Sequence, residues 1–182
     1  MYLIVTRAFP PELGGMQSLM WGFTKEMSKN FMIKVFADYQ ENHKEFDKNE
    51  NFSIERVGGI KFLRKIRKAQ LVNEFLKENR VQGVIADHWK SLELISTDKK
   101  KYCLIHGKEI NHPRGSSLNK RAIKVLNSVE KVIANSQYTK NLVPVREGES
   151  DLFKAMKQIS ETGKGPENQT PSAGCSIKWK NN

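Results

Sequence analysis

The segment over residues 2–17 most constrains the fold, because it combines a strand, a glycine turn and the start of a helix. Residues 2–6 are apolar and β-branched with little polar alternation, which is typical of a strand buried on both faces of a parallel sheet. Prolines within residues 9–11 end that strand, since proline cannot donate to a ladder. Gly14 and Gly15 then allow a tight turn and close approach of a ligand to the backbone. A helix that begins after such a turn can hold an anion at its first amides.

The remainder of the chain alternates between strand and helix patterns. We expect further strands over residues 33–37, 52–57, 81–86, 101–105 and 131–134, and helices over 16–27, 63–76, 91–95, 118–129 and from 138 to 143. The polar segment 38–51 is expected to be a loop or a poorly ordered excursion. In the helix over 63–76, Leu63 falls on the apolar face, and Lys68 falls on or beside the polar face. The order of elements predicts an α/β fold, a Rossmann-like parallel sheet flanked by helices.

Polar residues follow several of the predicted strands. Ligands of parallel sheets bind at the carboxyl ends of the strands, so these residues and the glycine turn should meet at one edge. Each also has a structural explanation, because a histidine can be satisfied internally, a lysine can be solvated and a serine can cap a helix. The residues are Asp87 and His88 after the fourth strand, His106, Gly107 and Lys108 after the fifth, and Ser136 after the sixth.

The net charge of +11 raises the question of an anionic partner. Of the 31 basic and 20 acidic residues, 25 and 15 precede Pro144, so the excess belongs to the main domain. The basic helix segment 61–68 is most simply a solvated face. It could also contact anionic lipid, at about 1 kcal/mol per basic side chain near the surface. Nucleic acid ranks last as a partner, because basic surfaces are common on enzymes that work at anionic membranes.

Other recognisable signals are few. The glycine turn matches neither the dinucleotide fingerprint nor the phosphate-binding P-loop. Cys103 and Cys175 have no CxxC spacing, so we expect no disulfide framework and no metal site. We expect no signal peptide and no membrane span. A cytoplasmic protein is the default, with a peripheral position at the inner face of the membrane as a further option.

The motifs FPPELGGMQ, ADHW, HGKEI and VIANSQYTKNL, in this order, resemble the N-terminal domain of retaining nucleotide-sugar glycosyltransferases with the GT-B fold. The resemblance covers residues 1–143 and implies a domain that mainly binds the acceptor of a hexose. It implies that Gly14 and Gly15 approach the donor diphosphate, and that His106 is a catalytic residue in the cleft. The resemblance implies no metal or cofactor beyond the nucleotide-sugar donor, and a glycan or lipid acceptor. On the acceptor side of the cleft it places Asp87, His88, Gly107, Lys108 and Ser136.

The segment over residues 144–182 does not continue that resemblance. We expect a helix over 150–161 and then a flexible tail, not a complete domain. Residues 151–180 resemble the C-terminus of thioredoxin-like redoxin proteins, but the redox CxxC is absent, so Cys175 is not credited with redox chemistry.

A GT-B enzyme also has a second Rossmann-like domain that holds most of the nucleotide sugar. The chain is therefore expected to be truncated and inactive alone. The alternatives are a noncatalytic module that binds a nucleotide, a glycan or a membrane surface, an inert gene-fusion fragment, and a basic nucleic-acid-binding protein.

Overall fold

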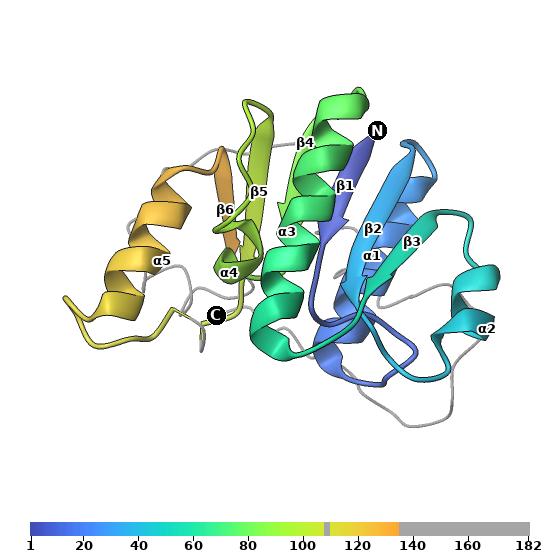
Figure 1. Ribbon diagram of the computed structural model, residues 1–182, viewed down its shortest axis with the longest axis horizontal. Helices are drawn as coiled ribbons and strands as arrows, with labels where there is room; N and C mark the ends of the chain where they lie inside the picture. Colours follow the sequence, from blue (N-terminus) through green and yellow to red (C-terminus); the bar gives the residue numbers. More distant parts are fainter. Residues whose placement is uncertain (108–109, 135–182) are drawn as a thin grey trace, which may run out of the picture.

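The computed structural model describes residues 1–107 and 110–134 (Figure 1). These residues form a six-stranded parallel sheet in the order β3-β2-β1-β4-β5-β6, which confirms the predicted fold class. The strands are β1 (Tyr2–Val5), β2 (Ile33–Asp38), β3 (Ser53–Val57), β4 (Gly83–Ala86), β5 (Lys100–Ile105) and β6 (Lys131–Ala134). The helices are α1 (Gly15–Ser28), α2 (His43–Lys48), α3 (Lys61–Glu78), α4 (Trp89–Leu92) and α5 (Ser117–Asn127).

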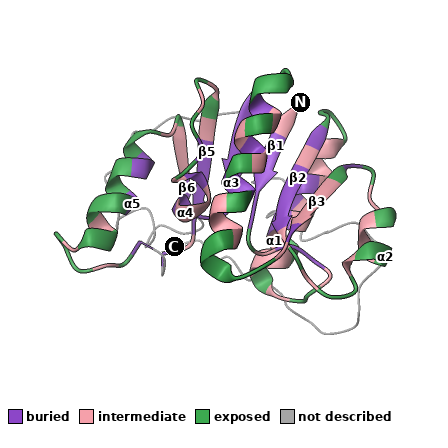
Figure 2. Ribbon diagram, in the orientation of Figure 1, coloured by how far each residue is buried: buried purple, intermediate pink, exposed green. Residues whose placement is uncertain are grey.

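Helices cover both faces of the sheet. Figure 1 shows α3, α4 and α5 on one face and α1 on the other. In β1, Leu3 and Val5 belong to the core under α3, α4 and α5, whereas Ile4 belongs to the core under α1. All three side chains are at most 1% exposed, and Figure 2 shows the central strands as buried. The apolar run of β1 therefore reflects burial on both faces, as predicted.

The chain reverses its direction of travel across the sheet between β1 and β4. From β1 it moves outward through β2 and β3, and it then returns to the other side of β1 as β4. The register sets Val5 beside Phe36 of β2 and beside Ala86 of β4, so β1 and β4 end level with each other and β2 continues to Asp38. A reversal of this kind is where open parallel sheets usually bind ligands, beyond the carboxyl ends of the strands.

The prediction of a loop over residues 38–51 is wrong in part, because it contains α2. Phe46 anchors this short helix, with its ring centroid 6.2 Å from that of Phe9 and 5.9 Å from that of Trp21. Asp47 also pairs with Arg56 of β3 at 2.7 Å. One apolar residue in a single turn gives no periodicity, so the sequence pattern could not reveal a helix that tertiary contacts stabilise.

Two side chains of α3 lie differently from the prediction. Lys68 is only 4% exposed, although the pattern placed it with the polar face. Leu63, expected on the apolar face, is 56% exposed. The long lysine stem packs like an apolar side chain while its amino group finds buried oxygen partners, which a hydropathy pattern does not register.

Several sequence predictions lie outside the described residues: Lys108, Ser136, the helix from residue 138 and the whole segment 144–182. Within the described part of the chain, no helix is both long and apolar enough to cross a lipid bilayer.

Candidate functional site

A buried carboxylate organises the edge of the sheet where β1 and β4 end. Asp87 follows β4 and is 3% exposed. Its Oδ2 accepts hydrogen bonds from the Thr6 hydroxyl at 2.8 Å and from the backbone N–H groups of Arg7 at 3.1 Å and Ala8 at 3.4 Å. Asp87 therefore fixes the backbone as it leaves β1 towards the glycine turn.

A second buried pair lies on the α3 side of the same edge. Lys68 Nζ donates to the carbonyl oxygen of Thr6 at 2.6 Å and to Oδ1 of Asp38, the last residue of β2. The other oxygen of Asp38 pairs with Nε of Arg64 at 3.2 Å. Burial lowers the pKa of Lys68 below its ordinary value, and the charge of Asp38 opposes that effect. Together these contacts tie α3 to the ends of β1 and β2.

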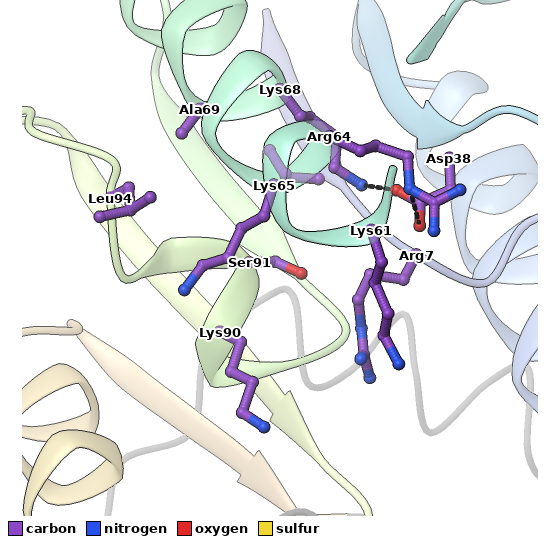
Figure 3. Close-up of a pocket in the computed structure, with 11 residues that line it drawn as sticks. Arg7, Asp38, Lys61, Arg64, Lys65, Lys68, Ala69, Lys90, Ser91 and Leu94 are labelled. Atoms are coloured by element: carbon purple, nitrogen blue, oxygen red, sulfur yellow. Dashed lines mark hydrogen bonds and ion pairs between the residues drawn. The ribbon is translucent and has the colours of Figure 1, made fainter. Parts of the chain in front are cut away.

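A pocket of about 230 Å³ opens above these pairs (Figure 3). Its lining side chains come from the ends of β1 and β2, the first turns of α3, and the segment that contains α4. They are predominantly cationic, and among the described residues Asp38 supplies the one carboxylate of the lining. The lining residues are Val5, Arg7, Asp38, Lys61, Arg64, Lys65, Lys68, Ala69, Lys90, Ser91 and Leu94.

Half of the cations in this lining are compensated by carboxylates. Asp38 neutralises part of the charge of Arg64 and Lys68, as described above. Lys65 pairs with Glu93, which also accepts two hydrogen bonds from Arg121 at 2.7 and 2.8 Å. Hydrogen bonding from Arg121, with that from Lys65, lowers the pKa of Glu93 to about 2. Glu93 is thus a carboxylate that holds Lys65 in place.

The other three cations add to a positive charge that Asp38 and Glu93 only partly balance, because each of these carboxylates pairs with two cations. Within residues 1–107 and 110–134, Arg7, Lys61 and Lys90 form no ion pair. Burial lowers the pKa of Lys90, and the positive charges of Arg7, Arg121 and Lys65 lower it further. These positive side chains repel one another, and an anion that enters the pocket would relieve the repulsion and be bound favourably.

The glycine turn lies at the same edge but leads into the helix on the opposite face of the sheet. Gly14 is the N-cap of α1, and among the described residues no side chain caps the helix. The first amides of such a helix lack intrahelical partners and favour a negative group. Gly15 is exposed, and a Cβ built there would meet nothing within 4 Å. The backbone is therefore open at Gly15, whereas the Gln17 side chain lies against Gly14.

His88 is buried and has a structural role. Its Nδ1 accepts a hydrogen bond of 2.9 Å from the backbone N–H of Lys90, which caps α4. Burial first, and then the positive charge of Arg7, lowers the pKa of His88 to about 3. The ring is therefore neutral near pH 7, with its proton on Nε2.

His106 and Gly107 follow β5, on the other side of β4 from β1. His106 is partly buried, and its charge contributes to the lowered pKa of His88, so the two rings share one electrostatic environment. Gly107 is buried and has φ 97°, a conformation that favours glycine. The structure thus gathers Asp87, His88, His106 and Gly107 along one edge, with Gly14 and Gly15 at the turn after β1.

The sequence interpretation missed Arg7, Asp38 and Lys90 as members of a pocket. The signal was available for two of them, because Arg7 lies two residues beyond the end of β1 and Asp38 ends β2. The rule that pointed to Asp87 would have pointed to them as well. Among the described residues, no group of three or more His, Cys, Asp or Glu side chains could hold a metal ion.

Comparison with known proteins supports the fold. No protein-family model matches the sequence, and no curated protein matches it. Solved structures do match, among them the crystal structures of Anabaena Alr3699/HepE in complex with UDP and in complex with UDP and glucose. Their TM-scores are 0.57 and 0.53 and their sequence identities to this chain 16% and 17%. Each match covers 85% of this chain and 40% of the HepE chain. This chain thus spans less than half the length of HepE, and its fold is like one Rossmann-like half of a GT-B glycosyltransferase.

Proposed function

We propose that this chain supplies the acceptor-side half of a nucleotide-sugar glycosyltransferase. The observation that carries the proposal is the fold shared with HepE, a protein crystallised with UDP and with UDP and glucose. The uncapped helix start after Gly14 adds support, because it lies at the edge where parallel sheets bind nucleotides. The complete enzyme would transfer a hexose, with retention at the anomeric carbon, to a hydroxyl of a glycan or lipid acceptor.

The proposed roles follow from position along the edge. Gly14 and Gly15 admit the donor diphosphate to the first amides of α1. In the transfer, the bond from the anomeric carbon to the diphosphate oxygen breaks with its electron pair left on that oxygen, and the acceptor hydroxyl gives its proton to the departing diphosphate as its oxygen bonds to that carbon. Helix amides stabilise the negative charge that develops on the departing diphosphate. His106 contacts the transferring sugar or the acceptor.

The remaining residues act on the acceptor side. Asp87 and His88 are buried, so in this proposal they position the loops after β1 and β4. Gly107 leaves room beside the sugar. Lys108 and Ser136 complete that wall as proposed contacts.

A titration of the full chain with UDP and UDP-glucose, followed residue by residue by NMR, tests the donor site. We expect the amide signals of Gly14, Gly15 and Met16 to shift most. Affinity should be weak, on the order of 1 mM, which corresponds to about −4 kcal/mol. Absence of shifts at millimolar UDP would contradict the proposal.

Turnover measurements on a panel of nucleotide sugars test whether this chain is only half of an enzyme or is active by itself. In this proposal the chain supplies only one wall of the cleft, so we expect binding with little or no transfer. Transfer at a typical enzymatic rate of about 10 s⁻¹ would contradict the half-site account. Pull-down of a second GT-B half would distinguish a split enzyme from a noncatalytic binding module.

A second candidate function is peripheral contact with an anionic membrane. Three apolar side chains at the start of α3 are exposed, Ile60 by 74%, Phe62 by 72% and Leu63 by 56%. They alternate with cationic residues of α3, a combination that suits the headgroup region of an anionic bilayer.

Co-sedimentation with phosphatidylcholine vesicles that contain phosphatidylglycerol tests this contact. Phe62→Ser should reduce binding severalfold. Met32→Ser is the matched control, since Met32 is 71% exposed and precedes β2 at the opposite edge of the sheet. Equal effects of the two substitutions would contradict a specific contact through α3.

A further inference from the structure

We propose that the basic pocket formed by β1, β2, α3 and α4 binds a phosphate group, and that this group belongs to the acceptor. The assignment to the acceptor rests on the proposed function, whereas the phosphate site does not. The ligand class is a phosphate monoester or a diphosphate, as found on sugar phosphates and on lipid-linked glycans.

The charge of the lining supports an anion with more than one negative charge. Asp38 and Glu93 balance only two of the positive charges around the pocket, and the guanidinium of Arg7 and the amino groups of Lys61 and Lys90 have no ion-pair partner among the described residues. Three cations around one cavity suit a phosphate dianion, because each can donate charge-assisted hydrogen bonds to its oxygens.

The partly buried ion pairs give this pocket a fixed wall. Lys68 is held by Thr6 and Asp38, and Lys65 is held by Glu93. A ligand entering here would meet charges that are already placed, so less conformational entropy is lost on binding. Arg7 itself is set by the hydrogen bond from its backbone N–H to Asp87.

The size of the pocket favours a small anionic group. Its volume of about 230 Å³ lies below the range of about 300–1,000 Å³ typical of pockets that enclose whole drug-sized ligands. The pocket therefore suits the phosphate end of a larger molecule, with the remainder of that molecule outside.

Position separates this pocket from the glycine turn. α1 packs on the face of β1 that carries Ile4, whereas α3 packs on the face that carries Leu3 and Val5. The pocket lies on the α3 face, as Figure 3 shows for its lining side chains. The carboxyl edge of the sheet thus offers two places for phosphate, the start of α1 at Gly15 and the basic pocket. If the donor diphosphate binds at Gly15, the basic pocket remains for the phosphate of the acceptor.

Titration of the full chain with inorganic pyrophosphate in low salt, by calorimetry, tests the phosphate site. Lys61→Gln, Arg7→Gln and Lys90→Gln should each weaken binding about tenfold, the loss expected for one charge-assisted hydrogen bond. Lys77→Gln is the matched control, because it removes the same charge from an exposed residue in the last turn of the same helix. Its affinity should change less than twofold. No binding, or equal losses in all four variants, would overturn the proposal.

The variant Gly15→Ala separates this inference from the proposed donor site. It should leave pyrophosphate affinity within twofold of wild type while it weakens UDP binding, and Lys61→Gln should do the reverse. If UDP does not bind but pyrophosphate binds with dependence on Lys61, the donor proposal fails and the phosphate pocket stands. If Gly15→Ala abolishes pyrophosphate binding, the anion lies at the glycine turn and the pocket proposal is wrong.

Two further probes identify the source of the phosphate. Glucose 1-phosphate represents a soluble acceptor, and vesicles of phosphatidylcholine with phosphatidic acid, whose headgroup is a phosphate monoester, represent a lipid headgroup. Competition of either probe with pyrophosphate, lost in Lys61→Gln, supports the pocket and names the source. Vesicle binding without any binding of pyrophosphate would indicate attraction to a charged surface and would overturn the proposal.

Discussion

The hydroxyl of Thr6 donates a 2.8 Å hydrogen bond to Oδ2 of Asp87. This contact joins the ends of β1 and β4, the neighbouring strands at which the chain changes the side of the sheet to which it adds strands. Thr6 is fully buried and Asp87 nearly so. The same carboxylate oxygen accepts from the backbone N–H of Arg7. This pair therefore sets where the chain leaves β1, on one side towards the glycine turn and on the other towards the basic pocket.

Loss of this pair should destabilise the fold. Asp87→Ala leaves several buried donors without an acceptor, so we expect the free energy of unfolding to fall by about 3 kcal/mol. Thr6→Val should cost about 1 kcal/mol, and the double variant should show a coupling of about 1 kcal/mol. Urea denaturation of the four proteins measures these values. Asp98→Ala is a control, since the Asp98 side chain is 81% exposed, and strict additivity would contradict the coupling.

Lys68 should matter for stability although lysine is rarely buried. Lys68→Met keeps the apolar stem but removes the donor to the Thr6 carbonyl and one partner of Asp38. Arg64 still compensates Asp38, so we expect a loss of about 2 kcal/mol, less than for an isolated buried charge. Lys77→Met, at the exposed end of the same helix, should be nearly neutral in the same thermal or urea experiment. A neutral Lys68→Met would show that these buried contacts contribute little net stability.

Acid should destabilise the folded state through His88. Its pKa falls from the ordinary 6.5 to about 3 in the folded protein, so between these values the unfolded chain binds a proton that the folded chain does not. The stability contribution of neutral His88 is therefore complete above about pH 6.5 and is lost as the pH falls towards 3, at up to about 1.4 kcal/mol per pH unit.

His88→Asn tests that pH dependence. Asparagine can cap α4 through its side-chain oxygen but has no proton to gain. We expect the unfolding free energy of the variant to depend less steeply on pH between 6.5 and 4 than that of the wild type. Parallel curves for the two proteins would show that His88 does not titrate as described.

The central strands could be predicted from sequence because each is marked by a continuous run of apolar residues. Residues 2–6 form a continuous apolar run, and only burial on both faces explains such a run. The edge position of Asp87, His88 and His106 followed from the parallel topology alone.

The positions of Arg7 and Asp38 after β1 and at the end of β2 could have been predicted, but the rest of the pocket could not, because it depends on long side chains that cross between elements. Lys68 appears in the sequence as one member of a basic run, and its hydropathy gives no sign of the carbonyl of Thr6 that receives it. The charge balance of the pocket likewise depends on Glu93, which lies 28 residues from Lys65. The helix α2 was missed for a related reason, since Phe46 packs on Phe9 and Trp21, which are distant in sequence.

The most direct measurement of the donor-site claim compares UDP binding by the wild type, Gly15→Ala and Gly22→Ala with calorimetry. A methyl group on Gly15 meets no protein atom within 4 Å, so the fold tolerates it, but the group would lie at the helix start where the diphosphate is proposed to bind. Gly22 lies within the same helix, and a Cβ there also meets nothing within 4 Å. Both variants should be as stable as the wild type or more stable, by up to about 1 kcal/mol. We predict that Gly15→Ala weakens UDP binding at least about fivefold, or about 1 kcal/mol, and that Gly22→Ala leaves it unchanged. Equal affinities in all three proteins would contradict the account.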